Sequence, residues 1–117
     1  GIVRKSGLPE PAARHLVHSY GSEVKKVLAY GKEDALLLRT VGDSPEVIGA
    51  QVVHAVREEM ACALSDVVMR RTDLGTVGHP GRAALEDCAR IMEKELGWPA
   101  ERTARELATT EAIFKLL

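Results

Sequence analysis

The longest helical pattern in this sequence lies between residues 48 and 71. Its apolar side chains recur every three or four positions, at Ile48, Val52, Val56, Met60, Ala63 and Val67. This spacing aligns them on one face of an α-helix, so the segment is predicted to form the spine of the fold. Ser44-Pro45-Glu46 predicts its start, because a hydroxyl cap, a proline and a carboxylate suit a first turn. The pattern does not decide between one helix as far as Arg71 and two, since Ser65-Asp66 could cap a second segment.

Further helices are predicted on both sides of this segment, each bounded by proline or glycine. They cover residues 9–20, 22–29, about 82–96, and 100 to about 108. A glycine-rich loop between Gly75 and Gly81 separates the central segment from the later helices. Residues 32–43 fit either a helical turn or a short extended segment.

The scarcity of aromatic residues favours helices over a sheet. Phe, Trp and Tyr make up only 3% of the chain, whereas hydrophobic residues together make up 45%. A sheet would normally contain more aromatic and β-branched side chains. The predicted fold is therefore an all-α domain of about five or six helices. Residues 1–8 are predicted to be a tail or linker, and residues 9–117 the helical domain.

Charge and cysteine content narrow the possible partners and compartment. The chain has 16 basic and 17 acidic residues and a net charge of −1, which gives it no bulk attraction for nucleic acid. No apolar run approaches the length of a membrane span. Cys62 and Cys88 lie among apolar residues and are predicted to be buried thiols in a reducing compartment, the cytoplasm. The sequence does not begin with methionine, which suggests either a piece of a longer protein or residues left over from an expression vector.

Few residues suggest chemistry of their own. His15 and His18 lie three apart, a spacing that can serve a metal, but no further ligand pair accompanies them, so a solvated or hydrogen-bonded pair is favoured. His54 and Glu58 lie four apart and are interpreted as part of a surface charge pattern on a helix. Gly75-Thr76-Val77-Gly78 lacks the spacing of a phosphate loop. No catalytic or metal-binding residue is predicted.

The segment Asp66–Thr72 is the strongest candidate for a contact site. Arg70 and Arg71 lie where a helix pattern ends, and cations there oppose the negative helix terminus. Asp66 and Arg70 are spaced for an ion pair within the helix. A second interpretation is that one guanidinium reaches a carboxylate or phosphate across a domain boundary. Asp66, Arg70, Arg71 and Thr72 are therefore the predicted interdomain or partner contacts.

Three blocks occur in an order that resembles a known family. They are Ala13–Leu16 with Tyr20–Ser22, then Ala50–Glu59, then Asp66–Thr72. Over about residues 10–98 the chain resembles the C-terminal helical domain of FAD-dependent (aerobic) glycerol-3-phosphate dehydrogenases and of the related alpha-glycerophosphate oxidases. The chain departs from the family at Gln51 and His54, where Glu and Tyr are frequent. It also carries Asp73 where many members have a basic or neutral residue.

The resemblance implies a parent enzyme that oxidises sn-glycerol 3-phosphate to dihydroxyacetone phosphate with hydride transfer to FAD. Electrons then pass to quinone or to oxygen. In that family the flavin fold, the substrate pocket and the catalytic groups lie upstream of this domain. The resemblance therefore implies FAD in the parent, no cofactor in this chain, and no activity of the chain alone.

The same resemblance sets expectations for partners. The upstream flavin and substrate domains are the expected contacts, a homo-oligomer is compatible with the pattern, and membrane contact would come only through the parent, as a peripheral enzyme of the cytoplasmic membrane. The alternative from a different class is a free-standing helical module for protein interaction, without enzymatic role. An upstream GxGxxG motif after a first strand would favour the enzyme, and an initiator Met directly before Gly1 would favour the free module.

Overall fold

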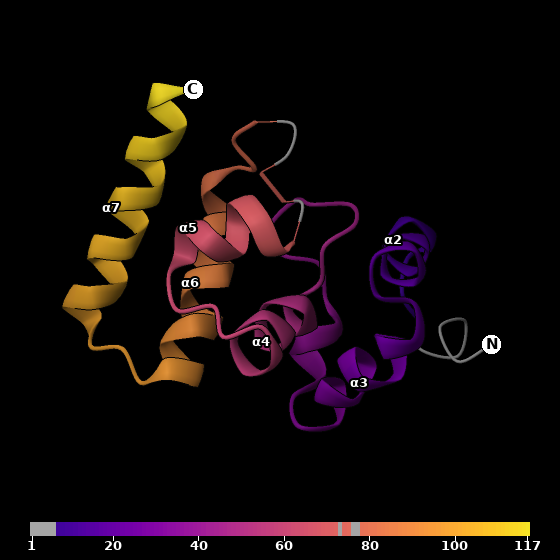
Figure 1. Cartoon of the computed structure of the whole chain (residues 1–117). Helices are drawn as coiled ribbons and strands as arrows, with labels where there is room; N and C mark the ends of the chain where they lie inside the picture. The colour runs from indigo at the N-terminus through magenta and orange to yellow at the C-terminus, as the bar shows by residue number, and fades with distance from the viewer. Residues whose placement is uncertain (1–6, 73, 76–77) are drawn as a thin grey trace.

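The computed structural model describes residues 7–72, 74–75 and 78–117. Its α-helices are α2 (Glu10–Tyr20), α3 (Val24–Ala29), α4 (Gly49–Glu58), α5 (Leu64–Asp66), α6 (Arg82–Leu96) and α7 (Ala100–Leu116) (Figure 1). Short 3-10 turns cover Gly21–Glu23, Tyr30–Lys32 and Ala35–Leu38, and a π turn covers Val67–Arg71. Within these residues the extended pairing is limited to one antiparallel bridge, Thr40 with Ile48. The predicted all-α fold is confirmed, with α5 as a single turn.

The central helix begins later than its sequence pattern predicted. α4 starts at Gly49, so the predicted start at Ser44 is wrong. The Ser44 hydroxyl does accept backbone N–H groups, from Glu46 at 3.3 Å and from Val47 at 3.1 Å, but it closes a turn rather than a helix. Val47 is held by a backbone bond in which its carbonyl accepts the N–H of Val41 at 2.9 Å. This pairing keeps the chain extended until the helix begins.

The central pattern forms two helical pieces rather than one. After α4 the chain turns at Met60, which has a φ of +60°. Ala55 accepts the backbone N–H of Ala61 at 3.0 Å and so closes the end of α4. The second piece starts at Leu64, whose backbone N–H donates to Glu106 Oε1 of α7 at 2.9 Å. The cap is therefore a side chain from a distant helix, not Ser65-Asp66.

The C-terminal helices agree with prediction at three of their four ends. α6 covers residues 82–96 as predicted, and Gly97 ends it in a left-handed conformation with a φ of +69°. α7 begins at Ala100 as predicted but continues to Leu116 rather than ending near Ala108. Thr110 is buried in the extra turns, and its hydroxyl donates to the carbonyl of Glu106 at 2.8 Å.

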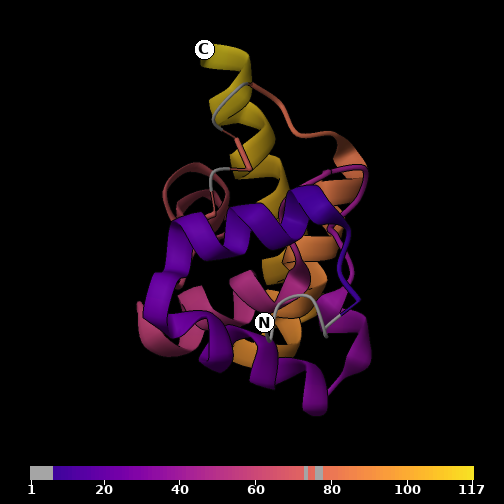
Figure 2. The same ribbon diagram turned by 90° about the vertical axis from the view of Figure 1, so that its right-hand side faces the viewer.

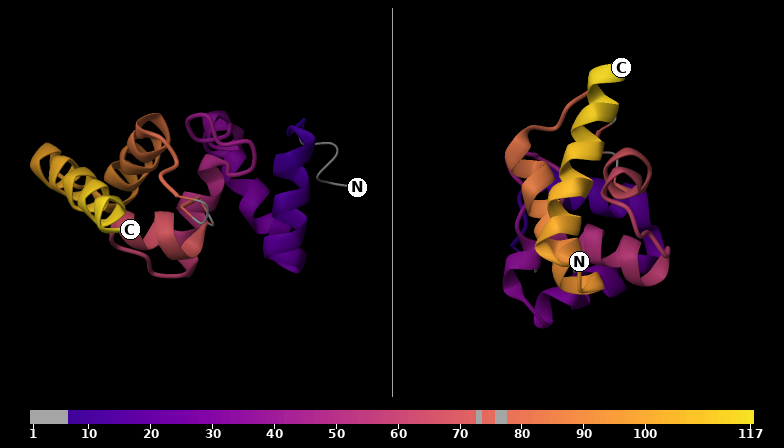
Figure 3. Two further views of the ribbon diagram at one scale, coloured as in Figure 1. Left: turned by 90° about the horizontal axis from the view of Figure 1, so that it is seen from above. Right: turned by 90° about the vertical axis from the view of Figure 1, so that its left-hand side faces the viewer.

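α4 lies at the centre of the domain, between the α2–α3 pair and the α6–α7 pair (Figure 3). α2 and α3 cover one side of it (Figure 2). One core cluster joins α4, α5 and α6, and a second joins α2, α3 and α4. Every residue from Gly49 to Ala55 is buried as a result. The spine predicted from periodicity is confirmed, but it is enclosed on more than one face.

The N-terminal tail predicted for residues 1–8 falls mostly outside the described residues, which begin at Gly7. Leu8 is half-buried and packs against the α2–α3 cluster. Asp73 and the Thr76-Val77 part of the predicted glycine loop also lie outside the described residues.

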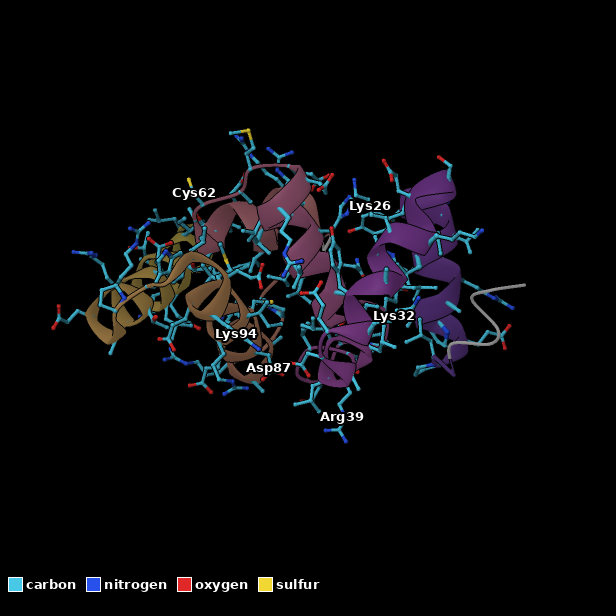
Figure 4. The ribbon with its side chains drawn as sticks, turned by 90° about the horizontal axis from the view of Figure 1, so that it is seen from below. Lys26, Lys32, Arg39, Cys62, Asp87 and Lys94 are labelled. Carbon is cyan, nitrogen blue, oxygen red and sulfur yellow. The ribbon has the colours of Figure 1, made fainter. Side chains whose placement is uncertain are left out.

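The two cysteines differ, although both were predicted to be buried. Cys88 is fully buried in α6, and burial raises the pKa of its thiol to about 12. Cys62 is exposed in the turn between α4 and α5, so the prediction is wrong there (Figure 4). Ala61 takes the buried position in this turn, and Met60 on its other side is exposed like Cys62.

This difference predicts two classes of thiol reactivity. In the native domain at neutral pH, a chromogenic disulfide reagent should react rapidly with Cys62 and slowly with Cys88, because only an accessible thiolate attacks. Cys62→Ser should remove the fast phase, whereas Cys88→Ser should leave it intact. Both thiols should react rapidly in urea. A fast phase that survives Cys62→Ser would contradict the assignment.

Candidate functional site

The π turn at the end of α5 arranges the predicted contact residues. Arg71 Nε lies 3.2 Å from Asp66 Oδ2, whereas Arg70 Nη1 lies 4.0 Å from Asp66 Oδ1. A π turn is one residue wider than an α turn, so it places residue i+5 rather than i+4 over residue i. The distance between Asp66 and Arg70, the expected pair, is therefore longer than the distance between Asp66 and Arg71.

Thr72 differs from the other three candidates because its side chain is buried and forms hydrogen bonds within the domain. It is 2% exposed, and its hydroxyl donates to the carbonyl of Val67 at 2.9 Å. The same oxygen accepts the backbone N–H of Leu74 at 3.4 Å. The hydroxyl thus closes the π turn and directs the chain into the following loop.

Replacing Thr72 with valine should destabilise the domain by about 1–2 kcal/mol, because the carbonyl of Val67 and the N–H of Leu74 lose their shared partner while the shape is kept. Thr109→Val is the matched control, since Thr109 is exposed on α7. Urea unfolding followed by circular dichroism measures both. Equal stability of the two variants would mean that the hydroxyl does not hold the turn.

Arg70 and Arg71 present their charges outward. The side chain of Arg70 is 78% exposed, and its contact with Asp66 is at the limit of an ion pair. The Arg71 side chain is 38% exposed and also lines a cleft. Of the four predicted residues, these two offer guanidinium groups to a partner. Of the two, Arg71 donates a hydrogen bond from its Nε to Asp66 Oδ2.

A polar cleft of about 590 Å³ lies between α2, α4 and the π turn. Its lining residues are His15, His18, Ser19, Tyr20, Glu23, Gln51, His54, Glu58, Glu59, Arg71 and Thr72. The structure thus brings Arg71 and Thr72 together with all three histidines noted in the sequence, although no spacing in the chain indicated this.

His54 lies in this cleft and not on the surface, so its interpretation as part of a surface charge pattern is wrong. The residue is only 5% exposed, and its ring meets Tyr20 edge-on at 5.3 Å between centroids. The ring of Tyr30 lies 6.3 Å away. The cause is the burial of α4 on more than one face, which a single amphipathic stripe does not reveal. Glu58 instead pairs with Lys26 of α3, which lowers the pKa of its carboxyl group.

His15 and His18 have different surroundings on α2. His15 Nδ1 lies 3.6 Å from Glu46 Oε2, and its side chain is 9% exposed. His18 is exposed on α2. In the described part of the chain, no group of three His, Cys, Asp or Glu side chains is placed to hold a metal ion.

Gln51 is a structural residue that the sequence marked only as a departure from a family pattern. It is fully buried, its Oε1 accepts the backbone N–H of Ile48 at 2.9 Å, and its Nε2 donates to the hydroxyl of Tyr20 at 3.4 Å. It therefore caps α4 and joins that helix to α2 under the cleft. Its position in the first turn of α4 is the signal that would have identified it, once the true helix start was known.

Comparison with known proteins finds relatives over nearly the whole chain. A probable mitochondrial glycerol-3-phosphate dehydrogenase of Dictyostelium discoideum is 33% identical over 99% of this chain and 18% of its own length. A glycerol-3-phosphate dehydrogenase of Mycobacterium leprae is 34% identical over 95% of this chain and 19% of its own length. One from Synechocystis is 31% identical over 86% of the chain and 18% of its length. The chain therefore spans less than a fifth of these relatives.

No solved structure matches the chain. A family profile does match, over residues 1–103, and it describes the C-terminal domain of alpha-glycerophosphate oxidase. The match covers the three blocks of the resemblance and extends beyond residues 10–98 at both ends. The chain belongs to the family of the C-terminal domain of alpha-glycerophosphate oxidase and is homologous to part of the glycerol-3-phosphate dehydrogenases.

Proposed function

We propose that this chain is the C-terminal accessory domain of an FAD-dependent glycerol-3-phosphate dehydrogenase. The parent would oxidise sn-glycerol 3-phosphate to dihydroxyacetone phosphate, with hydride transfer to FAD. The observation that carries the proposal is the family match over residues 1–103, together with relatives named glycerol-3-phosphate dehydrogenase at 33–34% identity. This chain covers only 18–19% of the length of those relatives. The proposal places the catalytic part in the remainder of the parent.

FAD does not fit the residues of this chain. A dinucleotide is normally held where parallel strands meet a glycine-rich turn and a helix N-terminus. The described residues contain helices and a single β-bridge, and the sequence has no GxGxxG motif. We place the flavin and the catalytic groups in the upstream domains. The domain alone is then inactive.

The domain's role in the parent is to pack against the upstream flavin and substrate domains. The contact we propose uses Arg70 and Arg71, whose guanidinium groups project from the π turn and can meet a carboxylate or phosphate. The near-neutral charge supports a protein partner, which includes a second copy of the chain, rather than nucleic acid.

We propose the cytoplasm as the location, with any membrane contact made by the parent as a peripheral enzyme. In the described residues, no helix combines the length and apolarity needed to span a bilayer.

Two observations test the proposed function. The coding sequence upstream of Gly1 should continue in frame into a first strand followed by GxGxxG. Titration of the purified chain with FAD should give no saturable change in flavin fluorescence. An initiator codon directly before Gly1 would contradict the proposal and favour a free-standing interaction module. Tight FAD binding by the chain alone would also contradict it.

A further inference from the structure

α7 holds the chain at the point where α5 begins. The backbone N–H of Leu64, the first residue of α5, donates to Glu106 Oε1 of α7 at 2.9 Å. Arg102, one turn earlier on α7, donates from its Nε to Glu106 Oε2 at 3.0 Å and from its Nη2 to the carbonyl of Cys62 at 3.4 Å. α7 therefore supplies hydrogen-bond partners to the backbone on both sides of the start of α5.

The last turns of α7 hold the chain after the π turn. Glu111 Oε1 lies 2.8 Å from His79 Nε2, and the centre of the Phe114 ring lies 5.0 Å from the centre of the His79 ring. Phe114 also packs against Gly75, where a Cβ would lie 3.0 Å from Phe114 Cζ. The N–H of Gly75 in turn donates to the carbonyl of Val68 in the π turn at 3.0 Å. One helix thus holds α5 and the π turn at both ends.

The segment between these two attachments is too short to be stable by itself. α5 has 3 residues and the π turn has 5. Isolated helices shorter than about 12–15 residues are marginal in water, so such a segment depends on its neighbours. Leu64, Val67 and Val68 anchor its apolar side in the larger core cluster, whereas α7 provides the contacts at its two ends. The order of those ends therefore depends on α7.

α7 is itself anchored less deeply than α6. It lies at the edge of the domain (Figure 1), and Thr110 is the one buried residue among the 17 that the structure describes in it. α6 has 15 residues and buries Ala84, Leu85, Cys88, Ala89 and Met92. Elements with few buried apolar side chains open locally at a lower free energy than the core does. α7 should therefore open before α6.

We infer that α7 and residues 64–72 form one cooperative unit, a clamp that opens while α4 and α6 stay folded. The closed clamp orders the π turn from both ends, and its opening releases both attachments at once. Arg70 and Arg71 belong to this unit, so their guanidinium groups keep a fixed arrangement only while the clamp is closed. The clamp thereby regulates the interdomain contact of these two arginines, a consequence that rests on the proposed function.

Native-state hydrogen exchange of the 117-residue chain, followed by NMR at low urea concentrations, tests the clamp. The most protected amides of α7 and of residues 64–72 should exchange at least about tenfold faster than those of α4 and α6. Both parts of the clamp should also share one urea dependence, because a single opening exposes them. Equal protection in all four elements, or different urea dependences for α7 and residues 64–72, would overturn the inference.

Two glycine substitutions test the coupling within the clamp. Ala108→Gly weakens α7 at an exposed position, and it should raise exchange in α7 and in residues 64–72 by the same factor, about fivefold. Ala83→Gly, at an exposed position on α6, is the matched control. It should raise exchange in α6 and leave both parts of the clamp unchanged, because α6 stays folded when the clamp opens. Unchanged circular dichroism establishes that both variants remain folded.

The coupling is contradicted if Ala108→Gly speeds exchange in α7 alone, or if both variants affect residues 64–72 equally. These outcomes are independent of the proposed function. A clamp in a chain whose initiator codon directly precedes Gly1 would remove the enzyme proposal and keep the clamp. A GxGxxG motif upstream of Gly1, together with independent opening of α7, would do the reverse.

Discussion

Replacing Gly42 with alanine should destabilise this domain by about 3 kcal/mol, because two penalties act at one position. Gly42 has a φ of +51°, a left-handed conformation that side chains disfavour. A Cβ there would also lie 2.4 Å from the backbone nitrogen of Ala84, where no flexible side chain can move away. In addition, the N–H of Gly42 donates to Asp87 Oδ2 at 2.7 Å, which fixes the loop against α6.

Gly97→Ala provides a control that also has a positive φ. Gly97 is left-handed with a φ of +69°, and a Cβ there meets no atom within 4 Å. Its replacement should cost only the conformational penalty, about 1 kcal/mol. The difference between the two variants in urea unfolding measures the contact between the Gly42 loop and α6. If both lose the same stability, that close approach is not a feature of the folded domain.

Leu85→Ala should destabilise the domain by about 3 kcal/mol, since it leaves a cavity in the larger core cluster. Leu85 is fully buried on α6 among side chains of α4 and α5. Leu96→Ala on the same helix is the matched control, because that side chain is 38% exposed. Leu96→Ala should lower the free energy of unfolding by less than about 1 kcal/mol. Chemical denaturation under reducing conditions gives both values, and a small loss for Leu85→Ala would contradict the packing of α4 on α6.

The sequence predicted most of the fold because local signals and packing agree along much of the chain. α6 is the clearest case, with its apolar face buried and Gly97 ending it in the conformation that glycine permits. The predicted start of α4 was wrong. Ser44-Pro45-Glu46 has the residues of a helix start, but the bridge between Thr40 and Ile48 holds the chain extended there. Such pairing depends on the fold and leaves no local pattern.

Polar contacts between residues far apart in the chain were also not predicted from the sequence. Glu106 caps α5 from a separate helix. Arg57 joins Glu33 to Glu95 and lies 5.2 Å from the centre of the Tyr30 ring, although it looks like an ordinary surface charge in the sequence. Each contact joins residues far apart in the chain, so no spacing rule finds it.

The candidate site was predictable in part. The pattern Asp66–Thr72 located a helix end with paired charges, and the structure places those charges there. Because of the π turn, Asp66 pairs more closely with Arg71 than with the expected Arg70. The cleft that His54 and Glu59 line depends on the packing of α2 beside α4, which the sequence did not predict. Whether Arg70 and Arg71 contact another domain stays a prediction.

A domain exchange tests the central claim most directly. In the Mycobacterium leprae glycerol-3-phosphate dehydrogenase, the segment aligned with this chain is replaced by the chain itself, and glycerol 3-phosphate-dependent reduction of an electron-acceptor dye is measured. Controls are the same enzyme without the segment and with an unrelated helical domain of similar size. An accessory domain of this family should keep the rate within about tenfold of the intact enzyme, a difference of about 1.4 kcal/mol in barrier height, while both controls lose activity. A soluble, flavin-loaded exchange enzyme no more active than the deletion would contradict the claim.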